Sequence, residues 1–218
     1  MKRAGNFNIM LNVIIIVAIL SYPLSFSEFD NLTQDGQNIL QICCTWGDRL
    51  KDDVLTFHIN NNIYQKDTLV RDSFDEWNSK LENVKFMEVQ DLSDADVLII
   101  FEQKVEETIG QTTTVIDGKG FIKRVKMHIS INFNEESINE DILRLVLKHE
   151  IGHALGLAHS NFHDLMNPLV NYQNKVITKC EIDAVRLANN WKFAENLQEP
   201  KLPKLPIEKT VDCGSKEI

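Results

Sequence analysis

Three histidines and one glutamate fall within the eleven residues HEIGHALGLAH, at positions 149–159. Side chains four residues apart lie on one face of an α-helix, so His149 and His153 can present imidazole nitrogens to a single metal ion. Zinc suits such nitrogens at about 2.0–2.1 Å, and a catalytic zinc site has three protein ligands and one position left for water. His159 is the natural third ligand. The pattern therefore predicts a catalytic zinc site.

The residues between the histidines fit the same chemistry. His159 lies six residues beyond His153, off the helical face, so the chain must turn back toward the ion. Gly156 permits this because, without a side chain, it can adopt the left-handed conformation that ends a helix. Glu150 directly follows His149 and would lie beside the open zinc position. A carboxylate there can take a proton from a metal-activated water and pass it to a leaving amine, so Glu150 is the candidate general base.

A protein of another class, a secreted or surface binding module with a structural, non-catalytic zinc site, is the alternative interpretation. A structural site normally closes with a fourth protein ligand and does not require a glutamate beside the ion. His163 is the only nearby candidate for that ligand, and its turn-like surroundings favour exposure to solvent. The glycine and third histidine that accompany HExxH favour the enzyme, an exported zinc-dependent endopeptidase.

Hydrophobic spacing predicts the elements that position these residues. Apolar runs, alternating or continuous, predict strands over residues 55–59, 86–89, 95–101 and 125–133. Apolar residues three and four apart predict helices over residues 67–81, around His149 and His153, and over residues 177–191. Strands and helices alternate and then helices dominate, which indicates one α+β domain.

Capping residues predict where the helices begin. Asp67 or Thr68 is available to cap the first helix. Capping-box patterns open the other two, and these are Ser137 with Glu140 and Thr178 with Glu181.

The composition is that of a globular protein. The chain has 218 residues, 43% of them hydrophobic, which suffices for one sizeable core. Its formal net charge of −9 offers nucleic acid no basic surface, so we expect no DNA or RNA partner. We divide the chain into a short lead-in (residues 28–53), a zinc metallopeptidase domain (54–193) and an extended Pro- and Lys-rich tail (194–218).

The N-terminus carries a targeting pattern. Lys2 and Arg3 precede an uncharged run over residues 4–27, whose centre is the apolar VIIIVAIL. This is typical of a secretory signal peptide cleaved near Ser27, and cleavage would remove two positive charges and change the net charge from −9 to −11. The alternative is an uncleaved membrane anchor. In both cases we expect a secreted or extracellular protein, and membrane contact only through residues 1–27 if they stay uncleaved.

Four cysteines in an oxidising compartment allow three disulfide pairings. They are Cys43, Cys44, Cys180 and Cys213. Because neighbouring cysteines rarely bond to each other, we expect Cys43 and Cys44 to pair elsewhere. One or two disulfides tying the flanks to the core are the expected outcome, with the pairs left open.

The sequence around the three histidines resembles a known family. HEIGHALGLAH matches the HExxHxxGxxH signature of the metzincin metallopeptidases, and Met166 in DLMNP resembles their methionine turn beneath the zinc. The serine after the third histidine and the proline after the turn are similar to the matrixin branch, and the likeness covers roughly residues 54–191. It implies a metzincin-type catalytic domain with a mixed twisted sheet, an active-site helix, a C-terminal helix and one catalytic Zn²⁺.

The resemblance also implies how substrate binds. A protein or peptide in extended form would pair with an edge strand, for which residues 120–123 are the best candidate. Residues 168–172 would wall a side-chain pocket, with Tyr172 either in that wall or on the surface. Glu181 would brace the methionine turn or act only as a cap. The sequence does not reveal which proteins are cleaved.

Three features depart from the matrixin pattern. The gap from His159 to Met166 is about one residue shorter than is usual there. No second, structural zinc segment lies between residues 102 and 133, where His128 stands alone on the expected solvent face. We recognise no long propeptide with a cysteine switch before the domain, although Cys43 and Cys44 stand upstream of it. Whether calcium binds the DGKG loop at residues 117–120 is left open.

Overall fold

A five-stranded mixed sheet is the frame of the molecule, which we describe from a computed structural model. The description covers residues 37–60, 66–82, 84–103, 108–133, 136–169, 174–189 and 209–214. The strands of this sheet are β2 (Val54–Asn60), β3 (Lys85–Glu88), β4 (Val97–Glu102), β5 (Gly110–Ile116) and β6 (Ile122–Ser130). They lie in the order β3-β2-β4-β6-β5, and only β5 is antiparallel to its neighbour. The predicted mixed sheet is confirmed.

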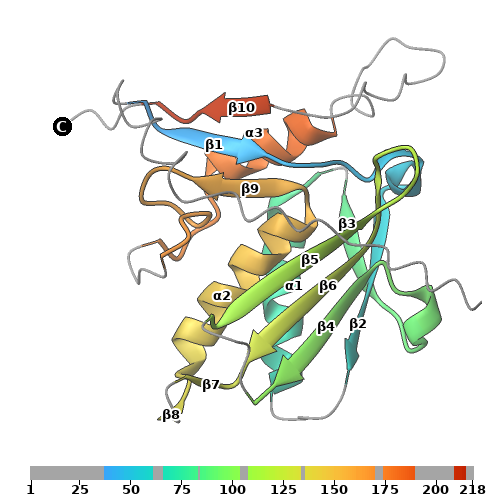
Figure 1. The fold of residues 1–218 in the computed structure, drawn as a ribbon, viewed down its shortest axis with the longest axis vertical. Coiled ribbons are helices and arrows are strands. Elements are labelled where there is room, and N and C mark those ends of the chain that lie inside the picture. Colours follow the sequence, from blue (N-terminus) through green and yellow to red (C-terminus); the bar gives the residue numbers. More distant parts are fainter. Residues whose placement is uncertain are drawn as a thin grey trace, which may run out of the picture.

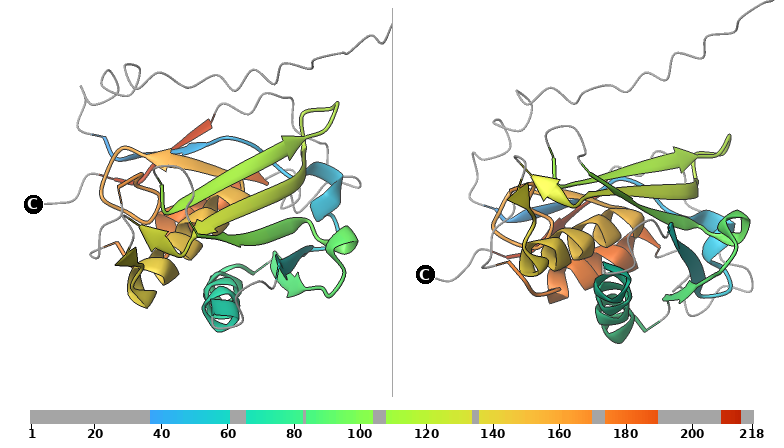
Figure 2. Two further views of the ribbon diagram at one scale, coloured as in Figure 1. Left: turned by 60° about the horizontal axis from the view of Figure 1, so that its bottom comes forward. Right: turned by 90° about the horizontal axis from the view of Figure 1, so that it is seen from below.

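In the described part of the chain, three α-helices accompany the sheet, and α1 and α2 cover the same face of it (Figures 1 and 2). They are α1 (Asp67–Lys80), α2 (Glu140–Ala154) and α3 (Lys179–Ala188). Short elements are the 3-10 turns η2 (Gly47–Leu50) and η4 (Leu92–Asp94) and the hairpin strands β7 (Asn132–Phe133) and β8 (Glu136–Ser137). The α+β class with an active-site helix and a C-terminal helix is confirmed.

The predicted apolar stripes form the core between the sheet and the helices. Phe74 and Trp77 of α1 are fully buried, and the Trp77 indole donates to the Lys148 carbonyl of α2 at 3.0 Å. Lys148 is itself buried, and its ammonium pairs with Glu76 of α1 at 3.1 Å. These contacts fix α2, which carries the candidate ligands, against α1.

Two of the three predicted caps are wrong. Helix α1 begins after Lys66, which makes no side-chain cap, with Asp67 already in its first turn. Ser137 lies in β8, and the cap of α2 is Asn139, whose side chain accepts from the Asp141 amide at 2.7 Å. Asparagine serves equally well as an N-cap, and the helix starts two residues later than expected. The Thr178–Glu181 capping box is present at α3.

A second, three-stranded antiparallel sheet lies above the first (Figure 1). Its order is β10 (Lys209–Asp212), β1 (Ile39–Ile42) and β9 (Leu157–Ser160). Strands β1 and β10 fall in the predicted lead-in and tail and were not expected as strands, since each has only four residues. The domain boundaries at residues 54 and 193 stay a prediction, but both flanks contribute to this sheet.

The cysteines form two disulfides. Cys180 of α3 is bonded to Cys213, which follows β10, so this bond ties a flank to the core as expected. Cys43 is bonded to Cys44, and the expectation that these neighbours would pair elsewhere is wrong. Both of their amides donate to the Gly156 carbonyl, at 2.9 and 3.4 Å, so the two residues share one backbone acceptor.

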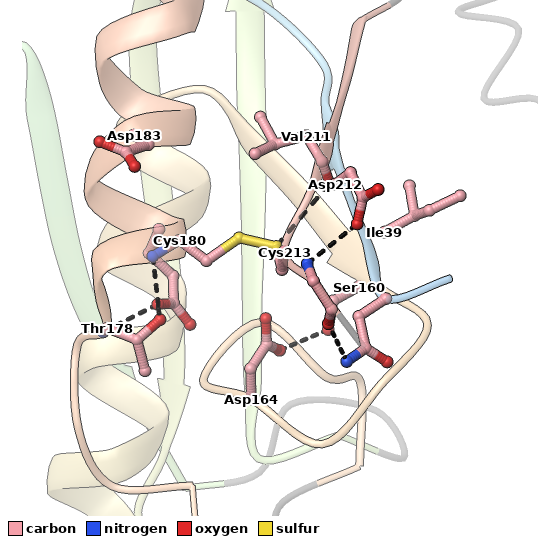
Figure 3. The surroundings of a disulfide bond; sticks show 12 residues. Ile39, Ser160, Asp164, Thr178, Cys180, Asp183, Val211, Asp212 and Cys213 are labelled. Atoms are coloured by element: carbon pink, nitrogen blue, oxygen red, sulfur yellow. Dashed lines mark hydrogen bonds between the residues drawn. A yellow bond between two sulfur atoms is a disulfide. The ribbon is translucent and has the colours of Figure 1, made fainter. Parts of the chain in front are cut away.

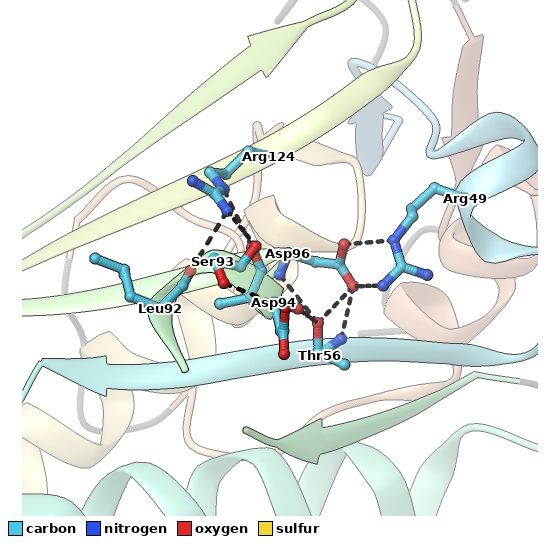
Figure 4. Close-up of polar contacts among 8 residues, drawn as sticks. Arg49, Thr56, Leu92, Ser93, Asp94, Asp96 and Arg124 are labelled. Carbon is cyan, nitrogen blue, oxygen red and sulfur yellow. Dashed lines mark hydrogen bonds and ion pairs between the residues drawn. The ribbon is translucent and has the colours of Figure 1, made fainter. Parts of the chain in front are cut away.

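A buried carboxylate links η2 to the parallel strands (Figure 4). Asp96 accepts two bonds of 2.5 Å from the Arg49 guanidinium and one of 2.7 Å from the Thr56 amide. Arg124 of β6 donates to the carbonyls of Ala95 and Ser93 at 3.1 Å. The end of the lead-in is therefore fastened to β2 and β4.

None of the helices in the part of the chain that the structure describes is long and apolar enough to cross a membrane. Residues 1–27, the expected signal peptide or anchor, lie outside the described residues.

Candidate metal centre and active site

The structure brings the three predicted histidines together. His149 and His153 project from α2 and His159 from β9, and each offers a nitrogen within 4.8 Å of the others. The Nε2 atoms of His149 and His153 are 3.1 Å apart. No other described group of histidine, cysteine and acidic side chains is arranged in this way.

The surroundings of the histidines suit zinc. His149 Nδ1 lies 2.7 Å from the Leu165 carbonyl and His153 Nδ1 lies 2.9 Å from the Leu157 carbonyl. A carbonyl partner fixes Nδ1 as the protonated nitrogen and leaves the Nε2 lone pair for a metal. Burial lowers the pKa of His149 and of His153 to about 4, so both rings are neutral at pH 7, as metal ligation requires.

The turn between the second and third ligands depends on Gly156. Helix α2 ends at Ala154, and Gly156 has φ +96°, the left-handed conformation predicted for it. A Cβ there would overlap the Cys44 carbonyl oxygen. Trp46 also reaches this end of α2, and its indole donates to the Ala154 carbonyl at 2.8 Å. The lead-in therefore holds the helix end in place, a contact that the sequence alone did not reveal.

Glu150 lies beside the histidines and beneath strand β5. Its side chain is buried, and Oε2 accepts a bond of 2.5 Å from the Thr112 hydroxyl. Burial raises the pKa of the Glu150 carboxyl, whereas the neighbouring His149 and the Thr112 hydroxyl lower it. A Cβ on Gly110 would lie 2.5 Å from Glu150 Oε1 and 2.6 Å from Val146, so only glycine leaves room for the carboxylate. Sequence reasoning missed both Gly110 and Thr112.

The edge strand that borders the site is β5, so the prediction of residues 120–123 is wrong. Those residues lead into β6, which lies between β4 and β5 and has no free edge. Strand β5 escaped detection because its inward side chains, Gly110, Thr112 and Thr114, are small or polar and give no apolar alternation. A free strand edge can accept an extended peptide through main-chain hydrogen bonds.

A cleft of about 730 Å³ runs between β5 and the segments around the third histidine. It contains His149, Glu150, His153 and His159, and apolar side chains line it nearby. These are Ile109, Leu145, Val146, Leu157, Leu165, Pro168 and Leu169. Pro168 and Leu169 belong to the predicted pocket wall, whereas residues 170–173, with Tyr172, lie outside the described residues.

Met166 lies in a buried turn below the helix of ligands. Its sulfur packs so closely on Gly152 of α2 that a Cβ there would overlap it. The Met166 carbonyl accepts from the Ser160 amide at 3.1 Å. Glu181 accepts from the Leu165 amide at 3.2 Å and from the Thr178 amide at 2.8 Å, so it both braces this turn and caps α3.

The two remaining histidines named above stand apart from the cluster. His163 is exposed and is not grouped with the three candidate ligands. His128 was expected to face solvent, but it is half-buried, and its Nδ1 lies 2.6 Å from the Glu102 carboxylate. Asp117 accepts from the amides of Lys119 and Phe121, at 2.8 and 3.0 Å, and these bonds shape the DGKG loop.

A family model matches the part of the chain that carries this site. The Matrixin family model (Peptidase_M10) matches residues 46–188, which include all three histidines. No curated protein matches the chain. Among solved structures, one similar to it is high choriolytic enzyme 1, a hatching enzyme zinc-protease from the medaka fish Oryzias latipes, at 16% identity and a TM-score of 0.34. That match covers 53% of this chain and 50% of the other, so the chain spans about half the length of that enzyme. On the family match, this chain belongs to the matrixin family of metzincin zinc metallopeptidases.

Proposed function

We propose that this protein is an exported zinc-dependent endopeptidase that hydrolyses internal peptide bonds. One observation carries the proposal: three imidazoles converge beside a buried carboxylate, in an open cleft that runs along a free strand edge. The imidazoles would hold the zinc, the carboxylate would move protons, and the strand edge would align the substrate. Met166 would support α2 from below.

Strand β5 and Glu150 would have separate roles in the reaction. An extended substrate pairs with β5, which places one peptide carbonyl near the three histidines. Zinc, when bound, supplies Lewis-acid activation of a water and of that carbonyl. Glu150 accepts the proton that the attacking water loses as its oxygen bonds to the carbonyl carbon. Glu150 then donates that proton to the amine nitrogen as the C–N bond breaks, so no covalent enzyme intermediate forms.

The apolar side of the cleft would receive a substrate side chain. Leu145, Val146 and Leu165 lie there together with Pro168 and Leu169, and Leu169 is 75% exposed at the rim. Burying an apolar substrate side chain against them would contribute about 25 cal/mol for each Å² removed from water. Export is supported by the N-terminal signal pattern and by two disulfides, which persist in oxidising compartments.

The observations disfavour a structural zinc site. His163, the only sequence candidate for a fourth ligand, is exposed and outside the cluster. A structural site has no use for the buried Glu150 carboxylate, whose desolvation costs free energy.

The test pairs zinc content with cleavage of casein, an unstructured substrate, by the purified protein and by its Glu150→Ala variant. We expect both to bind one zinc, and only the unchanged protein to cleave, with activity abolished by a chelator and restored by zinc. General acid–base groups contribute about 10²–10⁴-fold, so the variant should lose at least about 100-fold in kcat. If both bind zinc and neither cleaves casein or a varied peptide library, the endopeptidase proposal is wrong.

A further inference from the structure

His159 differs from the other two candidate ligands in how its ring is held. A backbone carbonyl contacts Nδ1 of His149 and of His153. Within the part of the chain that the structure describes, no hydrogen bond holds the His159 ring. The direction of that ring therefore depends on the backbone of β9. Whatever fixes β9 also fixes the third ligand.

Strand β1 is the neighbour that fixes β9. Leu40 pairs with Ser160 and Ile42 pairs with Leu157, so the paired residues enclose His159 on both sides. Leu40 and Ile42 are buried, at 0% and 4% exposure, so this edge of β1 is anchored in the core. Residues 37–42 lie before the 46–188 range that the family model matches, so this neighbour is an addition to the matched domain.

Asn161, two residues after His159, extends this pairing through its side chain. Its Oδ1 accepts from the Ile39 amide at 2.7 Å, and its Nδ2 donates to the Gln37 carbonyl at 3.1 Å. Its own amide donates to the Ile39 carbonyl at 3.1 Å. Asn161 thus joins the loop after the third ligand to β1 by three hydrogen bonds, two of which involve its side chain.

The far edge of β1 is covered in turn by β10. Asn38 Nδ2 donates to the Gly214 carbonyl at 2.6 Å, and the Cys213 amide donates to the Asn38 carbonyl at 2.7 Å. The disulfide from Cys213 to Cys180 then ties β10 to α3, and Figure 3 shows it beside Ile39 and Ser160. Covalent and hydrogen bonds therefore connect α3, β10, β1 and β9 in sequence.

We propose that β1, covered by β10, positions His159 for metal binding, and that Asn161 is the positioning residue that couples β1 to the ligand. We name residues 37–42 and 209–214 together the β1 brace. The proposal rests on the metal site proposed above and adds the source of its third ligand's rigidity. Groups that orient a ligand without touching the metal commonly change metal affinity by about 10–100-fold when they are removed.

The experiment compares Asn161→Ala with Asn78→Ala in the full protein. Each variant removes an asparagine side chain that makes two hydrogen bonds to main chain. Asn78 bonds to Phe86 of β3, at the sheet edge opposite β5 and outside the β1 brace, whereas Asn161 is joined to the ligand loop. Zinc affinity is measured by chelator competition, and the absorption spectrum of the Co²⁺-loaded protein reports ligand geometry. We expect Asn161→Ala to bind zinc about tenfold or more weakly with an altered Co²⁺ spectrum, and Asn78→Ala to match the unchanged protein in both.

The melting temperature of the metal-free protein separates positioning from general stability. A purely structural role would lower it in Asn161→Ala and leave zinc affinity and the Co²⁺ spectrum unchanged, which would overturn the proposal. If Asn161→Ala fails to fold, Asn161→Asp replaces it, since it keeps the acceptor for Ile39 and loses the donor to Gln37. That variant should bind zinc with intermediate affinity, and unchanged affinity would count against the brace. If the unchanged protein binds no zinc, the metal site itself fails, an outcome distinct from failure of the brace.

Discussion

The carboxylate of Glu150 is controlled by two residues of one strand. Thr112 donates to it at 2.5 Å, and Gly110 leaves the space that it occupies. A hydrogen bond to a charged group contributes about 1.5–3 kcal/mol, so the threonine hydroxyl has a measurable share in holding Glu150 in place. The glutamate is thus oriented from the substrate side of the cleft as well as from its own helix.

Replacing Thr112 with valine tests how much the threonine hydroxyl contributes to holding Glu150 in place. The change keeps the shape and removes the donor, and we expect kcat to fall about tenfold, equivalent to about 1.4 kcal/mol, with KM little changed. Thr112→Ser retains a hydroxyl and should retain most of the activity. Steady-state kinetics on one peptide will separate the two variants. A valine variant with unchanged kcat would show that Glu150 needs no such partner.

Asp164, in the turn after the third ligand, makes stability depend on pH. Burial raises its pKa to about 6, the Ser160 hydroxyl bond opposes this, and Glu181 adds to it. The folded state binds the proton of the Asp164 carboxyl more tightly than the unfolded state does. The contribution of this group to the unfolding free energy is therefore complete below about pH 4 and is lost as pH rises through about 6.

Asp164→Asn should remove that dependence. Between pH 4 and pH 7, we expect the unchanged protein to lose about 2–3 kcal/mol of unfolding free energy relative to the Asp164→Asn variant. Urea unfolding of both metal-free proteins at each pH gives the difference directly, and the histidines, common to both, cancel. Parallel pH curves would show that Asp164 does not titrate in this range.

At the scale of elements, the candidate active site lies where α2 passes beneath β5. Hydrophobic spacing predicted α1, α2, α3 and the buried strands, because Phe74, Trp77 and Leu147 each occupy regular core positions. The convergence of the three histidines and the Gly156 turn were predicted from spacing alone. Strand β5 could not be predicted in this way, because its inward side chains serve the cleft rather than the core. Strands β1 and β10 were missed because their stability depends on each other and on β9, which are distant in the chain.

The closeness of α2 to β5 leads to a prediction for Gly110→Ala. The added Cβ would meet Glu150 Oε1 at 2.5 Å, so the carboxylate must move away from its place beside the histidines. We expect kcat/KM to fall about 100-fold while zinc binding is kept. Gly118→Ala, in the loop that joins β5 to β6, is the control, because a Cβ there has nothing within 4 Å. Equal activity of the two variants would contradict the assigned position of Glu150.

Over the whole molecule, the flanks of the chain are part of the folded unit. The Cys180–Cys213 disulfide spans a sequence separation of 33 and holds the C-terminal flank on the second sheet. The Cys43–Cys44 disulfide joins adjacent residues and closes almost no loop. By the chain-entropy argument, only the first restricts the unfolded chain substantially.

Double serine variants of each pair test this contrast. Replacing Cys180 and Cys213 should lower the unfolding free energy by about 3–4 kcal/mol. Replacing Cys43 and Cys44 should change it much less, because there is little loop entropy to release. Chemical unfolding of both variants beside the unchanged protein measures the difference. Comparable losses would mean that native-state contacts, rather than loop closure, dominate at both bonds.

Strand β10 lies late in the chain, which determines when the third histidine gains its support during biosynthesis. It follows every other described element in the chain, yet it covers the strand that holds the third histidine. Until residues 209–214 have been synthesised, the strand that carries His159 lacks its completed support. On the proposals above, tight metal binding therefore requires β10, so proteolytic competence would arise only after this late segment has joined β1.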